Sequence, residues 1–195
     1  LAKIMVGELK PSSGNSKLGH NVQIGYFAQN QAEYLDGSKT VLQTMIDSAN
    51  ETNRSKVRDV LGSFLFKGDD VEKYVRVLSG GERNRLALAK LLLQPFNVLV
   101  MDEPTSHLDI KSKSVLKQAL VKFDGTLVLV SHDRDFLQNL TNKVYEFKSN
   151  NIREYLGDID FYLNQKKIED FREIEKKEKV VSIKKDKNID NSKER

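Results

Sequence analysis

An apolar run that ends in two adjacent carboxylates is the first feature able to do chemistry. The run VLVM at 98–101 is followed directly by Asp102, Glu103 and Pro104. In parallel α/β sheets, ligands bind beyond the carboxyl ends of the strands. A carboxylate there can hold Mg²⁺, and a second can orient or deprotonate an attacking water. Because neighbouring strand residues point to opposite faces, we expect the two carboxylates to do different jobs. Taken alone, the pair also fits an ordinary acidic turn.

A pair of glycines at a predicted helix start is the second feature. The sequence LSGGE occupies 78–82, and the helix that it opens runs to Leu93 and stops at Pro95. Ser79 can cap the helix, and the two glycines would let a phosphate approach the backbone N–H groups of its first turn. By itself the pattern fits an ordinary capped helix equally well.

Two further polar side chains follow predicted strands. His132 lies just past the apolar strand 126–130, and Gln29 ends the strand that begins at Val22. A neutral imidazole at a strand end can hydrogen-bond a terminal phosphate or the water that attacks it. Each residue alone also fits a structural or solvated side chain.

The elements that must position these residues alternate between strand and helix. This alternation predicts an α/β sheet. The strands 98–101 and 126–130 are uniformly apolar, so we expect them to be neighbours in a mainly parallel sheet, buried on both faces and away from an exposed edge. Further elements are predicted as helices at 41–49, 56–66 and 115–123 and a closing hairpin at 144–147 and 152–155.

Composition limits the classes of protein that remain. The chain of 195 residues has no cysteine and a net charge of +4, with 38% hydrophobic and 31% charged residues. It therefore has no disulfide or thiolate metal site, and it lacks the apolar run of about 18 residues needed to span a membrane. The mild positive charge permits contact with nucleic acid. From 164 onward Lys and Glu dominate; we expect a helix over 158–177 and no fixed contacts from 179 to 195.

Taken together and in order, the motifs resemble an ATP-binding cassette (ABC) domain over nearly all of 1–163. Gln29, LSGGE, VLVMDEP, SHLD and VSHD look like its Q-loop, signature, Walker B, D-loop and switch-histidine motifs. The details are similar to the ABC-F family, soluble twin-cassette ATPases that act on ribosomes. SHLD at 106–109 departs from the usual N-H-L-D at Ser106, whereas SHDRDF at 131–136 and YFAQ at 26–29 match, and YLGDIDFY at 155–162 matches imperfectly. RDVLGSFLFKG at 58–68 and the charged end resemble the second cassette.

The resemblance implies a fold, cofactors and partners. The fold would be a P-loop NTPase-type α/β nucleotide-binding domain, with a mainly parallel sheet and a helical subdomain at about 41–93. ATP and Mg²⁺ would bind between this cassette and a second one in the same parent chain. A ribosome or its RNA would be the partner, with no membrane partner and a cytoplasmic location.

The resemblance also implies a role for each motif residue. Asp102 and Gln29 would serve Mg²⁺ and water, Glu103 would polarise the attacking water, and His132 would contact the γ-phosphate. Asp109 would couple the two sites. The signature residues, of which Ser79 and Gly81 reach across to the opposite ATP, are Ser79, Gly80, Gly81 and Glu82.

A phosphate-binding loop of the form G-x-x-x-x-G-K-[ST] is absent from the sequence. Residues 1–6 read as the interior of a helix closed by Gly7, without a cap before it. We therefore interpret 1–163 as a partial ABC ATPase domain, truncated just after the Walker A loop, and 164–195 as a charged tail, helical and then disordered. The parent would be an ATPase, and this fragment would be inactive alone.

Two other functions remain compatible with the residues. One is the ATPase subunit of a membrane transporter, which SHLD and SHDRDF oppose. The other is a non-catalytic module that binds a ribosome through its basic surface; the retention of both Asp102 and Glu103 argues against it.

Overall fold

The computed structural model describes residues 1–28, 30–148 and 151–170, which form two compact units. The first unit runs from Leu1 to Phe136, and the second begins at Leu137. None of the helices in the described ranges is long and apolar enough to cross a membrane.

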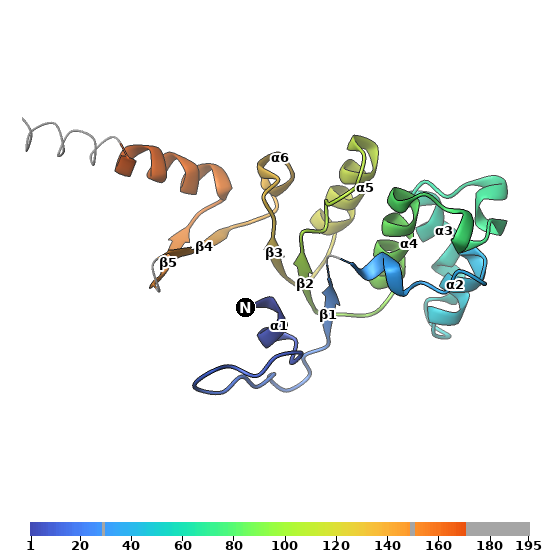
Figure 1. The fold of residues 1–195 in the computed structure, drawn as a ribbon, viewed down its shortest axis with the longest axis horizontal. Coiled ribbons are helices and arrows are strands. Elements are labelled where there is room, and N and C mark those ends of the chain that lie inside the picture. The colour runs from blue at the N-terminus through green and yellow to red at the C-terminus, as the bar shows by residue number, and fades with distance from the viewer. Residues whose placement is uncertain (29, 149–150, 171–195) are drawn as a thin grey trace, which may run out of the picture. The chain divides into compact units, whose positions relative to one another are not determined.

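The first unit is built on a parallel sheet in the order β1-β2-β3 (Figure 1). Its strands are β1 (Ile24–Phe27), β2 (Val98–Asp102) and β3 (Thr126–Val130). Leu99, Val100 and Met101 of the central strand are fully buried. The predicted strand at 98–101 is therefore confirmed as a buried strand with a parallel neighbour on each side.

The position of β3 corrects the sequence-based expectation. Within the described part of the chain β3 pairs with β2 alone, so it lies at the edge of the sheet. Its residues are half-buried or exposed, and Val130 is 44% exposed. The expectation that both apolar strands avoid an exposed edge is wrong for β3, because uniform apolarity reports burial of the faces and does not count the strands that pair along each edge.

Between β1 and β2 the chain forms a group of helices (Figure 1). Helices α2, α3 and α4 contact one another, and α4 also contacts β1, so it links this group to the sheet. Met45, Leu61 and Leu86 are fully buried in these helices. Each such side chain contributes about 1.5–3 kcal/mol when it leaves water. The helices are α2 (Val41–Ser48), η2 (Arg54–Lys56), α3 (Val57–Ser63), η3 (Gly68–Glu72), η4 (Val75–Val77) and α4 (Gly80–Leu92), with η1 (Gln31–Tyr34) just before them.

The remaining helices of this unit flank β1 and β3 in the chain. Helix α1 (Ala2–Met5) ends before Gly7, whose φ of 81° is the left-handed conformation expected of a terminating glycine. Helix α5 (Ile110–Val121) begins earlier than the predicted 115–123, because Asp109 caps it. A short helix, α6 (Arg134–Leu137), follows β3.

The second unit contains the predicted hairpin, formed by β4 (Lys143–Lys148) and β5 (Asn151–Leu156) pairing antiparallel. Residues 159–170 are helical, within the predicted 158–177. The helix is tied to the hairpin by Lys166, whose ammonium lies 2.7 Å from a Glu146 carboxylate oxygen. The rest of the predicted helix and the tail from 179 onward lie outside the described residues.

Candidate functional site

The carboxyl ends of β2 and β3 bring three of the predicted residues together. Asp102 is the last residue of β2 and pairs with Val130, the last residue of β3. Glu103 follows Asp102 directly, and His132 lies two residues beyond β3. Nε2 of His132 is 3.8 Å from Oε1 of Glu103. The imidazole is 98% exposed and the Glu103 side chain 21% exposed, so the histidine can reach a ligand from the solvent side.

Glu103 has a strained backbone. Its φ of 49° is left-handed, a conformation that costs a non-glycine residue on the order of 1–3 kcal/mol. Two hydrogen bonds hold it: its N–H donates to the Val130 carbonyl at 2.8 Å, and its own carbonyl accepts from the Ser106 N–H at 3.1 Å. The chain therefore turns directly after Asp102, and the two neighbouring carboxylates occupy different environments.

The Glu103 carboxylate has a buried oxygen, Oε1, which finds no hydrogen-bond donor among the described residues. A buried acceptor without a donor costs about 1–3 kcal/mol. An orphaned oxygen beside an exposed imidazole suits a carboxylate that accepts a hydrogen bond from a bound water. This is the geometry required of a group that orients a nucleophile.

The start of α4 presents backbone N–H groups with open space beside them. Ser79 caps the helix: its hydroxyl accepts from the Glu82 N–H at 3.2 Å, and its own N–H donates to Glu82 Oε2 at 2.7 Å. This backbone hydrogen bond holds the pKa of Glu82 below its usual value. A side chain added at Gly80 would meet nothing within 4 Å. Glu82 thus completes the cap, while Gly80 leaves a phosphate free to approach.

Asp109 caps the next helix along, α5. Its Oδ1 accepts from the Ser112 N–H at 2.7 Å, and its Oδ2 lies 3.4 Å from Nη1 of Arg85. The hydrogen bond from the Ser112 backbone is the main cause that keeps the pKa of Asp109 low, with Arg85 adding to it. Asp109 is therefore held as a carboxylate in a fixed position between α4 and α5.

Tyr26 is a further candidate site residue, which the sequence analysis did not single out. It pairs with Val100 in the sheet, and Asp102 is two residues further on, so Tyr26 and Asp102 share one face. The Tyr26 hydroxyl is buried and has no hydrogen-bond partner within the described ranges. Burial raises the pKa of this hydroxyl, and the negative charges of Asp102 and Glu8 raise it further. The sequence held no signal for this placement, because it depends on the register between β1 and β2. Gln29 lies outside the described residues.

The carboxylates of Asp102 and Glu103 suit a magnesium ion whose other ligands are phosphate oxygens and waters. No group of three His, Asp or Glu side chains with metal-binding geometry occurs in the described parts of the chain. Mg²⁺ commonly binds through one or two carboxylates together with phosphate oxygens and waters, without a full protein cage. Asp102, half-buried at the end of β2, can supply such a carboxylate.

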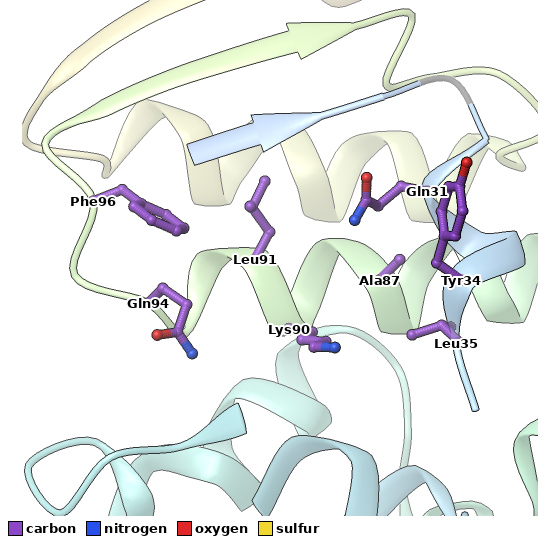
Figure 2. Close-up of a pocket in the computed structure, with 8 residues that line it drawn as sticks. All are labelled: Gln31, Tyr34, Leu35, Ala87, Lys90, Leu91, Gln94 and Phe96. Carbon is purple, nitrogen blue, oxygen red and sulfur yellow. The ribbon is translucent and has the colours of Figure 1, made fainter. Parts of the chain in front are cut away.

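A hollow of about 240 Å³ lies away from these residues, between η1 and α4 (Figure 2). Figure 2 shows Phe96 at one end of it, Leu91 in the middle and Ala87 beside Tyr34 and Gln31 at the other end. Neither carboxylate of the Asp102–Glu103 pair lines it. The candidate site is therefore the open end of the sheet and not this hollow.

Comparison with known proteins identifies the class. The family profile described as "ABC transporter" matches residues 1–106. YdiF of Bacillus subtilis (strain 168), named as an ATP-binding protein, is 50% identical over 166 residues, which cover 85% of this chain and 26% of that protein. ABC transporter F family member 5 of Arabidopsis thaliana is 42% identical over 191 residues, covering 94% of this chain and 27% of that protein. The chain thus spans about a quarter of the length of these relatives.

Two solved structures share the fold. The RNase-L Inhibitor matches with a TM-score of 0.62 and 22% identity over 80% of this chain and 32% of its own. The ATP-binding cassette MJ0796, solved as a dimer in a post-hydrolysis state with ADP and Pi, matches with a TM-score of 0.64 and 21% identity over 80% of this chain and 78% of its own. The predicted α/β fold of a P-loop NTPase-type cassette domain is confirmed.

The chain belongs to the ABC transporter family of ATP-binding cassette proteins. More narrowly, its relatives over most of its length are ABC-F members, so the resemblance recognised from the motifs is confirmed.

Proposed function

We propose that the complete protein carrying this chain binds and hydrolyses ATP, and that Glu103 polarises the attacking water. The observation that carries the proposal is the Glu103 carboxylate: a strained backbone holds it beside His132, and its Oε1 is buried without a donor in the described structure. A carboxylate in this state can accept a proton or a hydrogen bond from water as the phosphoryl group is attacked.

The neighbouring residues take separate roles in this proposal. Asp102 and Gln29 bind Mg²⁺, and His132 hydrogen-bonds the γ-phosphate from the exposed side. When bound with ATP, Mg²⁺ neutralises the charge that develops on the phosphate oxygens. Ser79, Gly80 and Gly81 offer the N-terminus of α4 to the phosphates of a second ATP, bound mainly by another cassette. That arrangement is supported by the membership of the family and by the open space beside Gly80.

Glu103→Gln in the complete protein, with any second hydrolytic site disabled, tests the assignment. We expect kcat to fall at least about 100-fold, because the amide cannot accept a proton, while the Kd for ATP changes by less than about threefold. Glu51→Gln is the matched control, because it makes the same substitution at a residue in an exposed turn. Steady-state hydrolysis and equilibrium ATP binding are measured for both variants. A near-normal kcat in Glu103→Gln would remove Glu103 from the mechanism.

The proposed partner is the ribosome, and the proposed location is the cytoplasm. Both are supported by the ABC-F motifs SHLD and SHDRDF and by the ABC-F relatives, and the net charge of +4 is compatible with an RNA surface. The complete Glu103→Gln protein should co-sediment with ribosomes in ATP more strongly than in ADP, because it retains ATP without turnover. Equal co-sedimentation with both nucleotides, or none, would contradict this partner.

A further inference from the structure

Helix α4 is joined to the loop that carries the candidate catalytic glutamate by a buried side chain, Asn84. This asparagine is 8% exposed, and its Nδ2 donates to the Ser106 carbonyl at 3.0 Å. Because Asn84 lies in the second turn of α4, this bond ties the phosphate-facing start of the helix to the loop.

The tied residue is the one that closes the turn of Glu103. The Ser106 N–H donates to the Glu103 carbonyl at 3.1 Å, while the Ser106 carbonyl accepts from Asn84. A single peptide segment is therefore held by Glu103 on one side and by α4 on the other. Since Glu103 has a left-handed backbone, its geometry depends on such outside restraints.

Two further contacts between the same helix and loop reinforce this bond. A Cβ built on Gly81 would lie 3.3 Å from the His107 carbonyl oxygen, so the helix start and the loop are already in close contact. Arg85 Nη1 lies 3.4 Å from Asp109 Oδ2 and 3.1 Å from the Ser112 hydroxyl. The Arg85 side chain is only 13% exposed. The helix start cannot shift without displacing the loop.

We propose that Asn84 is a positioning residue for hydrolysis: it sets the position of Glu103 according to the position of the start of α4. This inference rests on the proposed function, in which the start of α4 faces the phosphates of one ATP and Glu103 acts on another. Binding of a phosphate at Ser79 and Gly81 would then place Glu103 of the same cassette for attack. The link consists of the bond from Asn84 to Ser106 and the bond from Ser106 to Glu103.

The chain supplies a matched control for this bond. Asn53 is also 8% exposed, and its Nδ2 donates to a backbone carbonyl, that of Leu93, at 2.7 Å. Asn53 does not belong to α4; its bond to Leu93 lies at the C-terminal end of that helix, whose C-cap is Leu93. Truncating either asparagine to Ala removes one buried hydrogen bond to a backbone carbonyl, and Asn53→Ala also removes the bond that Asn53 Oδ1 accepts from the Asn50 N–H at 2.7 Å. Only the Asn84 change, however, touches the loop of Glu103.

The test compares Asn84→Ala with Asn53→Ala in the complete protein. We expect Asn84→Ala to lower kcat about 10- to 100-fold with KM for ATP changed by less than about twofold, because misplacement of a reacting group by about 1 Å has a cost of this size. Asn53→Ala should lower the thermal midpoint at least as much as Asn84→Ala does and leave kcat within about twofold of the wild type. Equal kcat for the two variants, or a raised KM with an unchanged kcat in Asn84→Ala, would overturn the inference.

A second variant covers the case in which Asn84→Ala does not fold. Asn84→Asp keeps the shape of the side chain and replaces its donor with an acceptor, so it should lower kcat at least as much. A wild-type kcat in Asn84→Asp would show that the bond to Ser106 is not needed. Glu103→Gln separates the two proposals. If Glu103→Gln keeps the wild-type kcat, the proposed function fails. If Glu103→Gln is inactive but both Asn84 variants have the same kcat as Asn53→Ala, only the positioning role of Asn84 fails.

Discussion

Two residues in the loop after β2 have a left-handed backbone, and one of them, Glu103, is held in it by two backbone hydrogen bonds. Glu103 and His107 have φ values of 49° and 62°; histidine is among the residue types that adopt this conformation more often, whereas glutamate is not. At Glu103 that strain is offset by the bond that its N–H donates to the Val130 carbonyl and by the bond that its carbonyl accepts from the Ser106 N–H. Strain held by neighbours is typical of functional loops.

Asp133 anchors the segment that carries His132, and it gives a prediction for pH dependence. Lys113 donates to Asp133 Oδ2 at 2.6 Å, and this bond is the main cause that lowers the pKa of Asp133. A lowered folded-state pKa means that the stabilisation is present above the unfolded-state pKa of about 3.9 and is lost as pH falls through the folded value. Asp133→Asn should therefore reduce the free energy of unfolding by about 1 kcal/mol at pH 7, allowing for the partial exposure of the pair.

The measurement is urea unfolding of the 195-residue chain, followed by circular dichroism at pH 7 and again below about pH 4, where the carboxyl of the unfolded state takes up its proton and the stabilisation begins to be lost. The difference between the wild type and Asp133→Asn should shrink at the lower pH. Asp135→Asn, an exposed carboxylate nearby, is the control and should shift the free energy by less than about 0.5 kcal/mol. A difference for Asp133→Asn that stayed constant through the acid range would contradict the ion pair.

At the scale of elements, the sequence predicted the start of α4 from its cap and missed the start of α5, which has a cap of the same kind. Ser79 and Glu82 form the capping box that their spacing implies, and α4 begins where predicted. Asp109 was recognised as a motif residue and not as a cap, so the predicted helix began five residues too late, at 115 in place of Ile110. The roles of Asn84 and Tyr26 were out of reach, because they depend on contacts with residues 22 and 74 positions away.

The packing of helix 159–170 against the β4–β5 hairpin gives an element-scale prediction. Lys166 lies 2.7 Å from Glu146 and 3.3 Å from Glu169, and its side chain is 21% exposed. The bond to Glu146 is the main cause that raises the pKa of Lys166 above its usual value. Among the described residues, replacing Lys166 with Met leaves Glu146 with only the hydroxyl donors Tyr155 and Tyr162.

We therefore expect Lys166→Met to lower the protection of helix 159–170 in amide hydrogen exchange by about tenfold, which corresponds to about 1.4 kcal/mol of local opening. Lys167→Met is the matched control, since Lys167 is exposed and makes no ion pair within the described ranges. Its protection should stay within about twofold of the wild type. If both variants lost the same protection, the Lys166–Glu146 pair would not hold the helix to the hairpin.

For the whole molecule, the motifs predicted the fold class and the order of the site residues, and the strand patterns predicted that β2 and β3 are neighbours, whereas the pairing of the second edge of β3 lay beyond the reach of sequence patterns. A uniformly apolar strand such as 126–130 is compatible with one paired edge or two, because side-chain pattern reports the faces of a sheet. The described structure pairs β3 on one edge only. An unpaired apolar edge is a site for further strand pairing or association.

The last prediction concerns ATP binding by the 195-residue chain itself, whose sequence contains no G-x-x-x-x-G-K-[ST] loop. Phosphate positioning and charge neutralisation dominate phosphoryl transfer, and Asp102 and Glu103 present only negative charge to a polyanion. The start of α4 can attract a phosphate, but one exposed helix N-terminus contributes only about 1 kcal/mol, far short of the roughly 8 kcal/mol required for micromolar binding. Calorimetry with Mg-ATP should therefore detect no micromolar binding, and no hydrolysis should be measurable. A micromolar Kd would mean that the described residues contain a phosphate cradle beyond Ser79, Gly80 and Gly81.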